Sequence, residues 1–157
     1  ALKQMIDVYN EYSATIVGVQ TVPHEVTFQY GIVNGKFVDE RVYKVKDLVE
    51  KPPVDEAPSD IAILGRYILT PDVFRYLENQ EKGAGGEIQL TDALKRMARE
   101  QAVYAYDFKG HRYDCGDKVG FLQAGIEFGL RRPELREKLE EYIKKLAEDI
   151  DAAIDYD

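Results

Sequence analysis

One candidate for chemistry is a glutamate–lysine pair directly before two prolines. Glu50 and Lys51 close an apolar run and precede Pro52 and Pro53. Because proline cannot donate to a central strand ladder, we expect a strand to end here with both charged side chains at its mouth. A lysine offers a point charge and three donors to a phosphate, and a carboxylate accepts hydrogen bonds from sugar hydroxyls. An ordinary solvated surface pair is the alternative.

A second candidate cluster is rich in glycine. It contains Gly83, Gly85, Gly86 and Glu87 and precedes a helix expected from about Leu90. Glycines let a backbone approach a ligand closely and free its amide groups for hydrogen bonding. No Gly-Lys-Ser/Thr sequence follows, which excludes a Walker motif. A plain connection between two helices is the alternative interpretation.

The third cluster is a polar turn that contains two carboxylates. Asp114 and Asp117 could ligate Mg²⁺, which takes oxygen ligands and often only one or two of them from protein. For Asp117 we favour a cap on the following helix. Cys115 lies between them, and neither histidine of the chain is spaced to act as its partner. We therefore expect Cys115 to be a small buried side chain rather than a nucleophile.

Both helices and strands are needed to position these clusters. Apolar spacing predicts the following elements: helices at 2–11, after 70, from about 90, at 119–130 and from 133; strands at 14–20, 42–49, 61–69 and 103–108; and a hairpin at 30–38 that turns at Asn34-Gly35. This order predicts an α/β protein with a mixed, partly antiparallel sheet and flanking helices. We expect a single domain over residues 1–157, with a helical tail from about residue 133.

Composition narrows the choice of partner and compartment. The 157 residues include 21 Lys+Arg against 29 Asp+Glu, a net charge of -8. Nucleic-acid binding requires a concentrated basic surface, so we expect none. No apolar run approaches the roughly 18 residues of a membrane span, so we expect no membrane partner. A single cysteine fits a reducing cytoplasm.

Taken in order, these motifs resemble the bacterial UTP–glucose-1-phosphate uridylyltransferases. The resemblance rests on five stretches, which are YGIV at 30–33, LVEKP at 48–52, LGRYILTP at 64–71, GGEIQLTDA at 85–93 and YDCGDK at 113–118. It extends to the helix near Leu146 and covers nothing beyond about Glu148. It implies a nucleotide-diphospho-sugar transferase, Rossmann-like fold, of which this chain would be the carboxyl-terminal half.

The resemblance also implies a reaction and roles for residues in it. Glucose 1-phosphate would attack the α-phosphorus of UTP, giving UDP-glucose and pyrophosphate with Mg²⁺ present. Lys51 would bind the phosphate of glucose 1-phosphate, and Glu50 would bind the glucose hydroxyls. Gly31 would let the sugar approach the backbone.

Four further residues take their expected roles from the same resemblance. Gly85, Gly86 and Glu87 would line the sugar side or an adjoining subunit contact. Asp114 would correspond to a metal-binding aspartate. We also expect a homo-oligomer, to which an apolar stripe on the last helix could contribute, although packing on its own domain would suit that stripe equally well.

The family's nucleotide-binding half has no counterpart in these residues. Its glycine-rich loop for the triphosphate and its Mg²⁺-binding aspartate are both missing. We therefore expect this chain to be inactive unless another chain supplies that half. Two alternatives stay open, which are a non-catalytic sugar-phosphate-binding module and a sister nucleotidyltransferase, such as a thymidylyltransferase.

Overall fold

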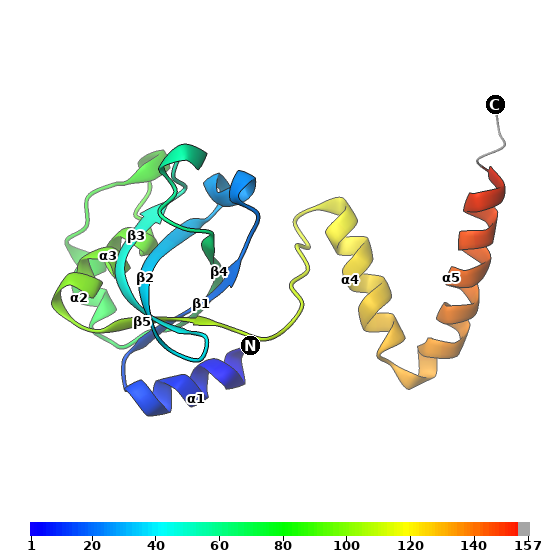
Figure 1. Cartoon of the computed structure of the whole chain (residues 1–157), viewed down its shortest axis with the longest axis horizontal. Helices are drawn as coiled ribbons and strands as arrows, with labels where there is room; N and C mark the ends of the chain where they lie inside the picture. The colour runs from blue at the N-terminus through cyan, green and yellow to red at the C-terminus, as the bar shows by residue number, and fades with distance from the viewer. Residues whose placement is uncertain (154–157) are drawn as a thin grey trace. The chain divides into compact units, whose positions relative to one another are not determined.

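The computed structural model describes residues 1–153 and divides them into two compact units. The first, the barrel unit, is Ala1–Gly110, and the second, the helical unit, begins at His111. Figure 1 shows every strand in the barrel unit and two successive helices in the helical unit. The expected helical tail from about residue 133 coincides with the second of these helices.

Five strands of the barrel unit close on themselves in the order β1-β4-β2-β3-β5. Their bounds are β1 Thr15–Thr21, β2 Gly31–Asp39, β3 Val42–Glu50, β4 Ile61–Ile68 and β5 Val103–Asp107. β1 and β5 run parallel, and the other neighbouring pairs are antiparallel. The expected mixed sheet is confirmed, and its closure removes the open edges that a flat sheet would leave.

Five α-helices accompany the strands within residues 1–153. They are α1 Leu2–Tyr12, α2 Val73–Glu78, α3 Leu90–Glu100, α4 Lys118–Leu130 and α5 Pro133–Ala153. Of these, α1 and α3 show a clear amphipathic pattern. α1 buries Met5 and Val8, and α3 buries Leu94 and Met97, each pair three residues apart on one helical face. Two separate apolar clusters result, one beneath α1 and one beneath α2 and α3. Strand β1 is therefore buried on both faces.

The expected hairpin turn at Asn34-Gly35 is wrong. β2 continues through both residues, and the chain reverses at Glu40 and Arg41. The register between β2 and β3 shifts between Asn34 and Gly35. A glycine inside a strand often marks such a bulge, so the Asn-Gly pair bends a longer hairpin instead of ending a short one.

Arg41 fastens this hairpin turn to β5. Its Nε donates to the backbone carbonyl of Asp107 at 2.5 Å, and its Nη2 lies 2.9 Å from Oδ2 of the same residue. The Asp107 N–H in turn donates to the Arg41 carbonyl at 2.9 Å. The guanidinium fork thus binds side chain and backbone of one residue, a geometry that the ammonium of lysine cannot reproduce.

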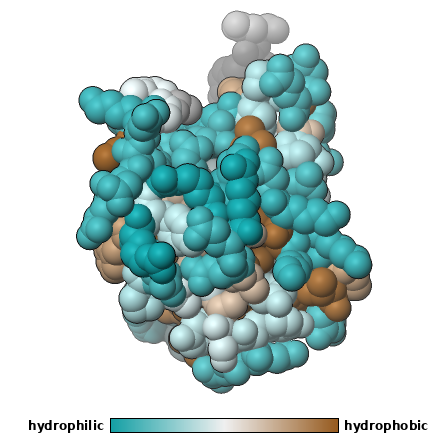
Figure 2. Space-filling view, turned by 90° about the vertical axis from the view of Figure 1, so that its left-hand side faces the viewer, coloured by the Kyte–Doolittle hydropathy of each residue, from teal (hydrophilic) through white to brown (hydrophobic). Residues whose placement is uncertain are grey.

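Figure 2 shows a largely hydrophilic face, with apolar side chains exposed at several places. Across residues 1–153, every helix is too short or too polar to cross a bilayer.

The Arg41–Asp107 link gives a test of barrel closure. We expect Arg41→Ala to lower the free energy of unfolding by about 1–2 kcal/mol, because it removes a charge-assisted bond from a partly buried turn. Arg41→Lys should recover less than half of that loss, since it keeps the charge without the fork. Urea unfolding followed by tyrosine fluorescence measures both values. Equal stability of Arg41→Ala and the native chain would contradict this role.

Candidate functional site

Three residues from separate elements meet at one end of the β2–β3 pair. Gly31 begins β2 and lies opposite Glu50, the last residue of β3. Thr91, in the first turn of α3, donates its hydroxyl hydrogen to Glu50 Oε2 at 2.5 Å. Gly31 and Thr91 are buried, and Glu50 is partly exposed. We call this group the Glu50 cradle.

Gly31 makes the cradle possible because it has no side chain. A Cβ placed there would lie 3.0 Å from Glu50 Oε2, 3.1 Å from Thr91 Oγ1 and 3.2 Å from Ile63 Cδ1. All three distances are tighter than ordinary van der Waals contact between a methyl group and its neighbours. Any larger residue would therefore displace the carboxylate or the hydroxyl that holds it.

The cradle lines a cavity of about 270 Å³. The remaining lining residues are Gln29, Tyr30, Ile63, Gly65, Tyr67, Gln89 and Leu90. This mixture of a carboxylate, hydroxyls, amides and apolar groups is typical of a site for a small polar ligand. The cavity volume is close to the lower end of the range for ligand pockets, about 300 Å³.

Tyr67 adds a phenol to this cavity. Burial, and secondarily the negative charge of Glu50, raise the pKa of Tyr67 above its ordinary value. Both effects disfavour the phenolate. Near neutral pH the Tyr67 hydroxyl is therefore protonated and can donate a hydrogen bond.

Lys51 follows Glu50 in a strained backbone conformation. Its φ is 45°, and its N–H donates to the Tyr30 carbonyl at 3.0 Å. A positive φ is unfavourable for a residue with a side chain, and the following Pro52 restricts it further. Such outliers cluster at functional sites. Within the described part of the chain the exposed Lys51 ammonium pairs with no carboxylate, so no solvated Glu50–Lys51 ion pair forms.

The glycine segment, residues 83–87, lies outside the cavity lining. Gly85 and Gly86 take φ values of 71° and 77° and are exposed, as is Glu87. The next residues along the chain that line the cavity are Gln89, Leu90 and Thr91, at the start of α3. The structure thus brings Gly31 and Glu50 together, whereas Lys51, Gly85, Gly86 and Glu87 lie outside the cavity lining.

Asp114 lies in the helical unit and is exposed. Its Oδ2 is 2.7 Å from Arg112 Nη2, and its Oδ1 accepts the Gly116 N–H at 3.0 Å. Among residues 1–153, no three His, Cys, Asp or Glu side chains cluster in a way that could hold a metal ion. One carboxylate fits a magnesium site that is completed by waters and ligand phosphates, but it makes no such site alone.

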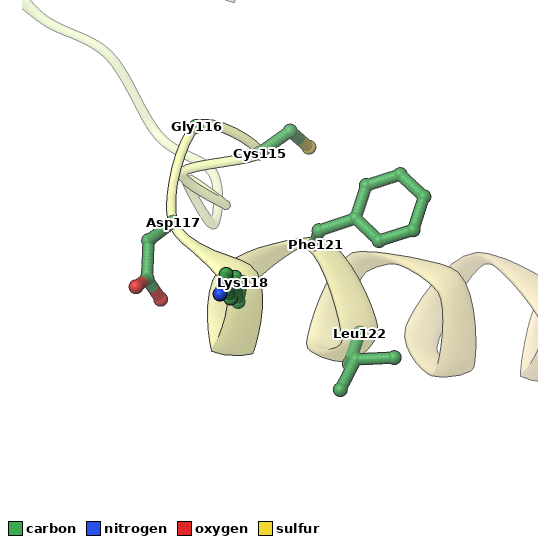
Figure 3. Close-up of a pocket in the computed structure, with 6 residues that line it drawn as sticks. All are labelled: Cys115, Gly116, Asp117, Lys118, Phe121 and Leu122. Atoms are coloured by element: carbon green, nitrogen blue, oxygen red, sulfur yellow. The ribbon is translucent and has the colours of Figure 1, made fainter.

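Asp117 caps α4, as expected, by accepting the Gly120 N–H at 2.8 Å. The expectation of a buried Cys115 is wrong, since its side chain is exposed. Figure 3 shows the Cys115 sulfur and the Phe121 ring on one side of the turn, with the Asp117 carboxylate directed away from them. These residues line a separate, mostly apolar hollow of about 360 Å³.

Sequence reasoning missed two contributors to the cavity, Thr91 and Tyr67. Both lie inside stretches that were singled out, LGRYILTP and GGEIQLTDA. Residue type alone is a weak signal of a binding role for either, because threonine and tyrosine are common in folded cores and at helix starts. The structure identifies Thr91 through its hydrogen bond to Glu50, and Tyr67 through its place in the cavity lining.

The chain is similar to known proteins over most of its length. A family model described as nucleotidyl transferase matches residues 1–128. The chain belongs to the nucleotidyl transferase family. The resemblance found in the motifs is therefore confirmed at the level of the family.

Two relatives of this nucleotidyl transferase chain carry the same name. This chain is 50% identical over 146 residues to the UTP–glucose-1-phosphate uridylyltransferase of Staphylococcus epidermidis. The matched residues make up 93% of this chain and 51% of that protein. The chain is 50% identical over 145 residues to the enzyme of the same name from Bacillus subtilis, covering 92% and 50%. The chain thus spans about half the length of the curated relatives it matches.

Solved structures agree in fold. A UDP-glucose pyrophosphorylase complexed with UDP-glucose is 44% identical, with a TM-score of 0.80 over 83% of this chain and 50% of that one. A UTP-bound enzyme of this kind from Acinetobacter baumannii is 37% identical, with a TM-score of 0.80 over 92% and 50%. The α/β assignment is confirmed by both.

The crowding at Gly31 gives a test of the cradle. We expect Gly31→Ala to lower the melting temperature by several degrees, because the new methyl must displace Glu50 or Thr91. Such overpacking lowers the free energy of unfolding by about 1–3 kcal/mol. Gly125→Ala is the control, since a Cβ on Gly125 meets nothing within 4 Å. Alanine favours a helix interior, so that variant should melt no lower than the native chain. A native-like melting temperature for Gly31→Ala would contradict the close approach.

The raised pKa of Tyr67 gives an alkaline test. A raised pKa means that the folded state favours the neutral phenol, so its contribution to stability is complete below about pH 10 and is lost as pH rises through the folded pKa. We expect Tyr67→Phe to flatten part of the alkaline decline in the free energy of unfolding. Urea titrations in alkaline buffers, compared with the native chain, measure the difference. Identical declines would show that Tyr67 is not shielded beside Glu50.

Proposed function

We propose that this chain is the sugar-phosphate-binding, carboxyl-terminal half of a UTP–glucose-1-phosphate uridylyltransferase. The observation that carries the proposal is the Glu50 cradle, a carboxylate fixed against a glycine in a small polar cavity. Identity of about 50% to enzymes of that name supports the choice of substrates. The intact protein would bind UTP and release UDP-glucose and pyrophosphate.

Glucose hydroxyls are the groups that the cavity suits. A carboxylate accepts hydrogen bonds from neighbouring hydroxyls, and Glu50 is held in one place to do so. The bare backbone of Gly31 leaves room for a sugar ring to approach. Tyr67, protonated near neutral pH, offers a donor to a sugar oxygen.

Lys51 would hold the phosphate of glucose 1-phosphate. Its ammonium is exposed and comes one residue after the sugar-binding carboxylate. A sugar phosphate needs a hydroxyl-binding group and a cation close together, and this order supplies both. Transfer to UTP then depends on positioning and charge neutralisation rather than on a covalent nucleophile of the protein.

Asp114 would supply one carboxylate to Mg²⁺, which neutralises phosphate charge when bound. Its remaining ligands would come from phosphates, waters and the other half of the protein. That half would also bind the triphosphate, so the 157-residue chain alone would not catalyse the reaction. A likeness to a putative thymidylyltransferase from Bacillus anthracis, 24% identical with a TM-score of 0.58, concerns the fold alone.

A homo-oligomer also stays a proposal. The last helix exposes Leu135, Tyr142, Leu146 and Ile150. These exposed side chains would be available for a contact with a second copy.

Calorimetric titration of glucose 1-phosphate into this chain tests the proposal. We expect Lys51→Ala to weaken binding about tenfold or more, because a charged hydrogen bond to phosphate is lost. Glu50→Gln should weaken it as well, since the amide presents one acceptor oxygen where the carboxylate presents two. Lys46→Ala is the matched control, an exposed lysine of β3 that does not line the cavity. Equal weakening by Lys51→Ala and Lys46→Ala would contradict a specific phosphate contact.

A further inference from the structure

We infer that Thr91 is a positioning residue, which holds the Glu50 carboxylate in the orientation that selects the sugar. This inference rests on the proposed function, because it assigns Glu50 to sugar hydroxyls. Thr91 itself need not touch the ligand for the inference to hold. Its part is to decide where the Glu50 oxygens lie.

The contact between the two side chains is short and shielded. The Thr91 hydroxyl donates to Glu50 Oε2 at 2.5 Å, and Thr91 is 5% exposed. A threonine side chain is stiff about its first torsion, so the hydroxyl oxygen has a fixed place on α3. A hydrogen bond to a charged acceptor is also stronger than one between neutral groups.

The direction of this hydroxyl is the observation that separates positioning from an ordinary helix cap. Threonines near helix starts usually bond to the local backbone of their own helix. Thr91 instead reaches the end of β3, forty-one residues earlier in the chain. Thr91 thus serves the carboxylate rather than the helix end.

Glu50 needs such a restraint because it lies at the end of a strand and is partly exposed. A glutamate side chain has three rotatable bonds and loses considerable rotamer freedom when it is fixed. Without a partner, the carboxylate would spend much of its time away from the cavity. The bond to Thr91 engages Oε2 and leaves the lone pairs of Oε1 for a ligand hydroxyl.

The predicted consequence is a loss of sugar discrimination. A site built to hydrogen-bond a hydroxyl rejects an analogue that lacks it, because the buried acceptor is then left unpaired. A carboxylate that is free to turn toward water can form hydrogen bonds there, so the missing hydroxyl of an analogue costs it little binding free energy. Thr91→Val, which is close to isosteric but lacks the hydroxyl, should therefore bind glucose 1-phosphate more weakly and distinguish it less well from deoxy analogues.

The first measurement reports on Glu50 without any ligand. NMR scalar couplings across the Glu50 side-chain bonds distinguish one rotamer from an average of several. We expect a single rotamer in the native chain and in Thr91→Ser, and averaged couplings in Thr91→Val. Thr91→Ala, a second variant without the hydroxyl, replaces Thr91→Val if the latter melts far below the native chain. Unchanged Glu50 couplings in the hydroxyl-free variants would overturn the inference.

The second measurement uses the ligand. Affinities of glucose 1-phosphate and of its 2-deoxy and 3-deoxy analogues for this chain give a discrimination ratio for each variant. We expect the ratio for at least one analogue to fall about tenfold in Thr91→Val and to return in Thr91→Ser. A merely structural role would weaken all ligands equally and leave the ratios unchanged. That outcome would contradict positioning.

Two further comparisons separate this inference from the proposed function. In a Glu50→Ala background, Thr91→Val should have no additional effect on affinity if it acts through the carboxylate. Additive effects would overturn the inference while leaving the sugar site in place. If the native chain binds no glucose 1-phosphate at all, the proposed function fails for this chain, and the couplings alone decide whether Thr91 positions Glu50.

Discussion

The register between β2 and β3 is the constraint on which the rest of the site depends. It places Gly31, which has no side chain, opposite Glu50 at the end of the pair. A slip of one residue would turn every side chain of the strand to the opposite face. The bulge at Gly35 and the Arg41 fork at the turn hold this register from the other end of the hairpin.

Barrel closure supports that register, because β2 and β3 each pair with a further strand on their other side. β3 is paired on one side with β2 and on the other with β5, so it cannot slide without breaking two ladders. α3 packs against the same barrel through its buried face and brings Thr91 to the end of β3. The Glu50 cradle is thus built on two strands and a helix, which hold a ligand more accurately than loops do. Lys51, the residue after Glu50, lies outside the cavity lining.

Much of the fold could be predicted from the sequence, because long periodic segments carry strong signals. The strand at 14–20 and the helix from Leu90 were correctly expected from their apolar patterns. The turn at Asn34-Gly35 was wrong, since the local signal for a hairpin and for a bulge is the same glycine. Closure into a barrel depends on pairing between β3 and β5, which are distant in the sequence, and no local pattern indicates it.

The site was predicted in part for a related reason. The proline pair after Lys51 correctly indicated a strand end with Glu50 at its mouth, and family motifs pointed to Gly31. Thr91 could not be singled out, because its importance comes from a contact across forty-one residues rather than from its type.

The most direct test of the central claim, that the Glu50 cradle is a sugar-phosphate site, is an NMR titration of this chain with glucose 1-phosphate. We expect amide shift changes concentrated at Gly31, Glu50, Lys51 and Thr91. Changes confined to the helical unit, or no changes in a folded sample, would contradict it.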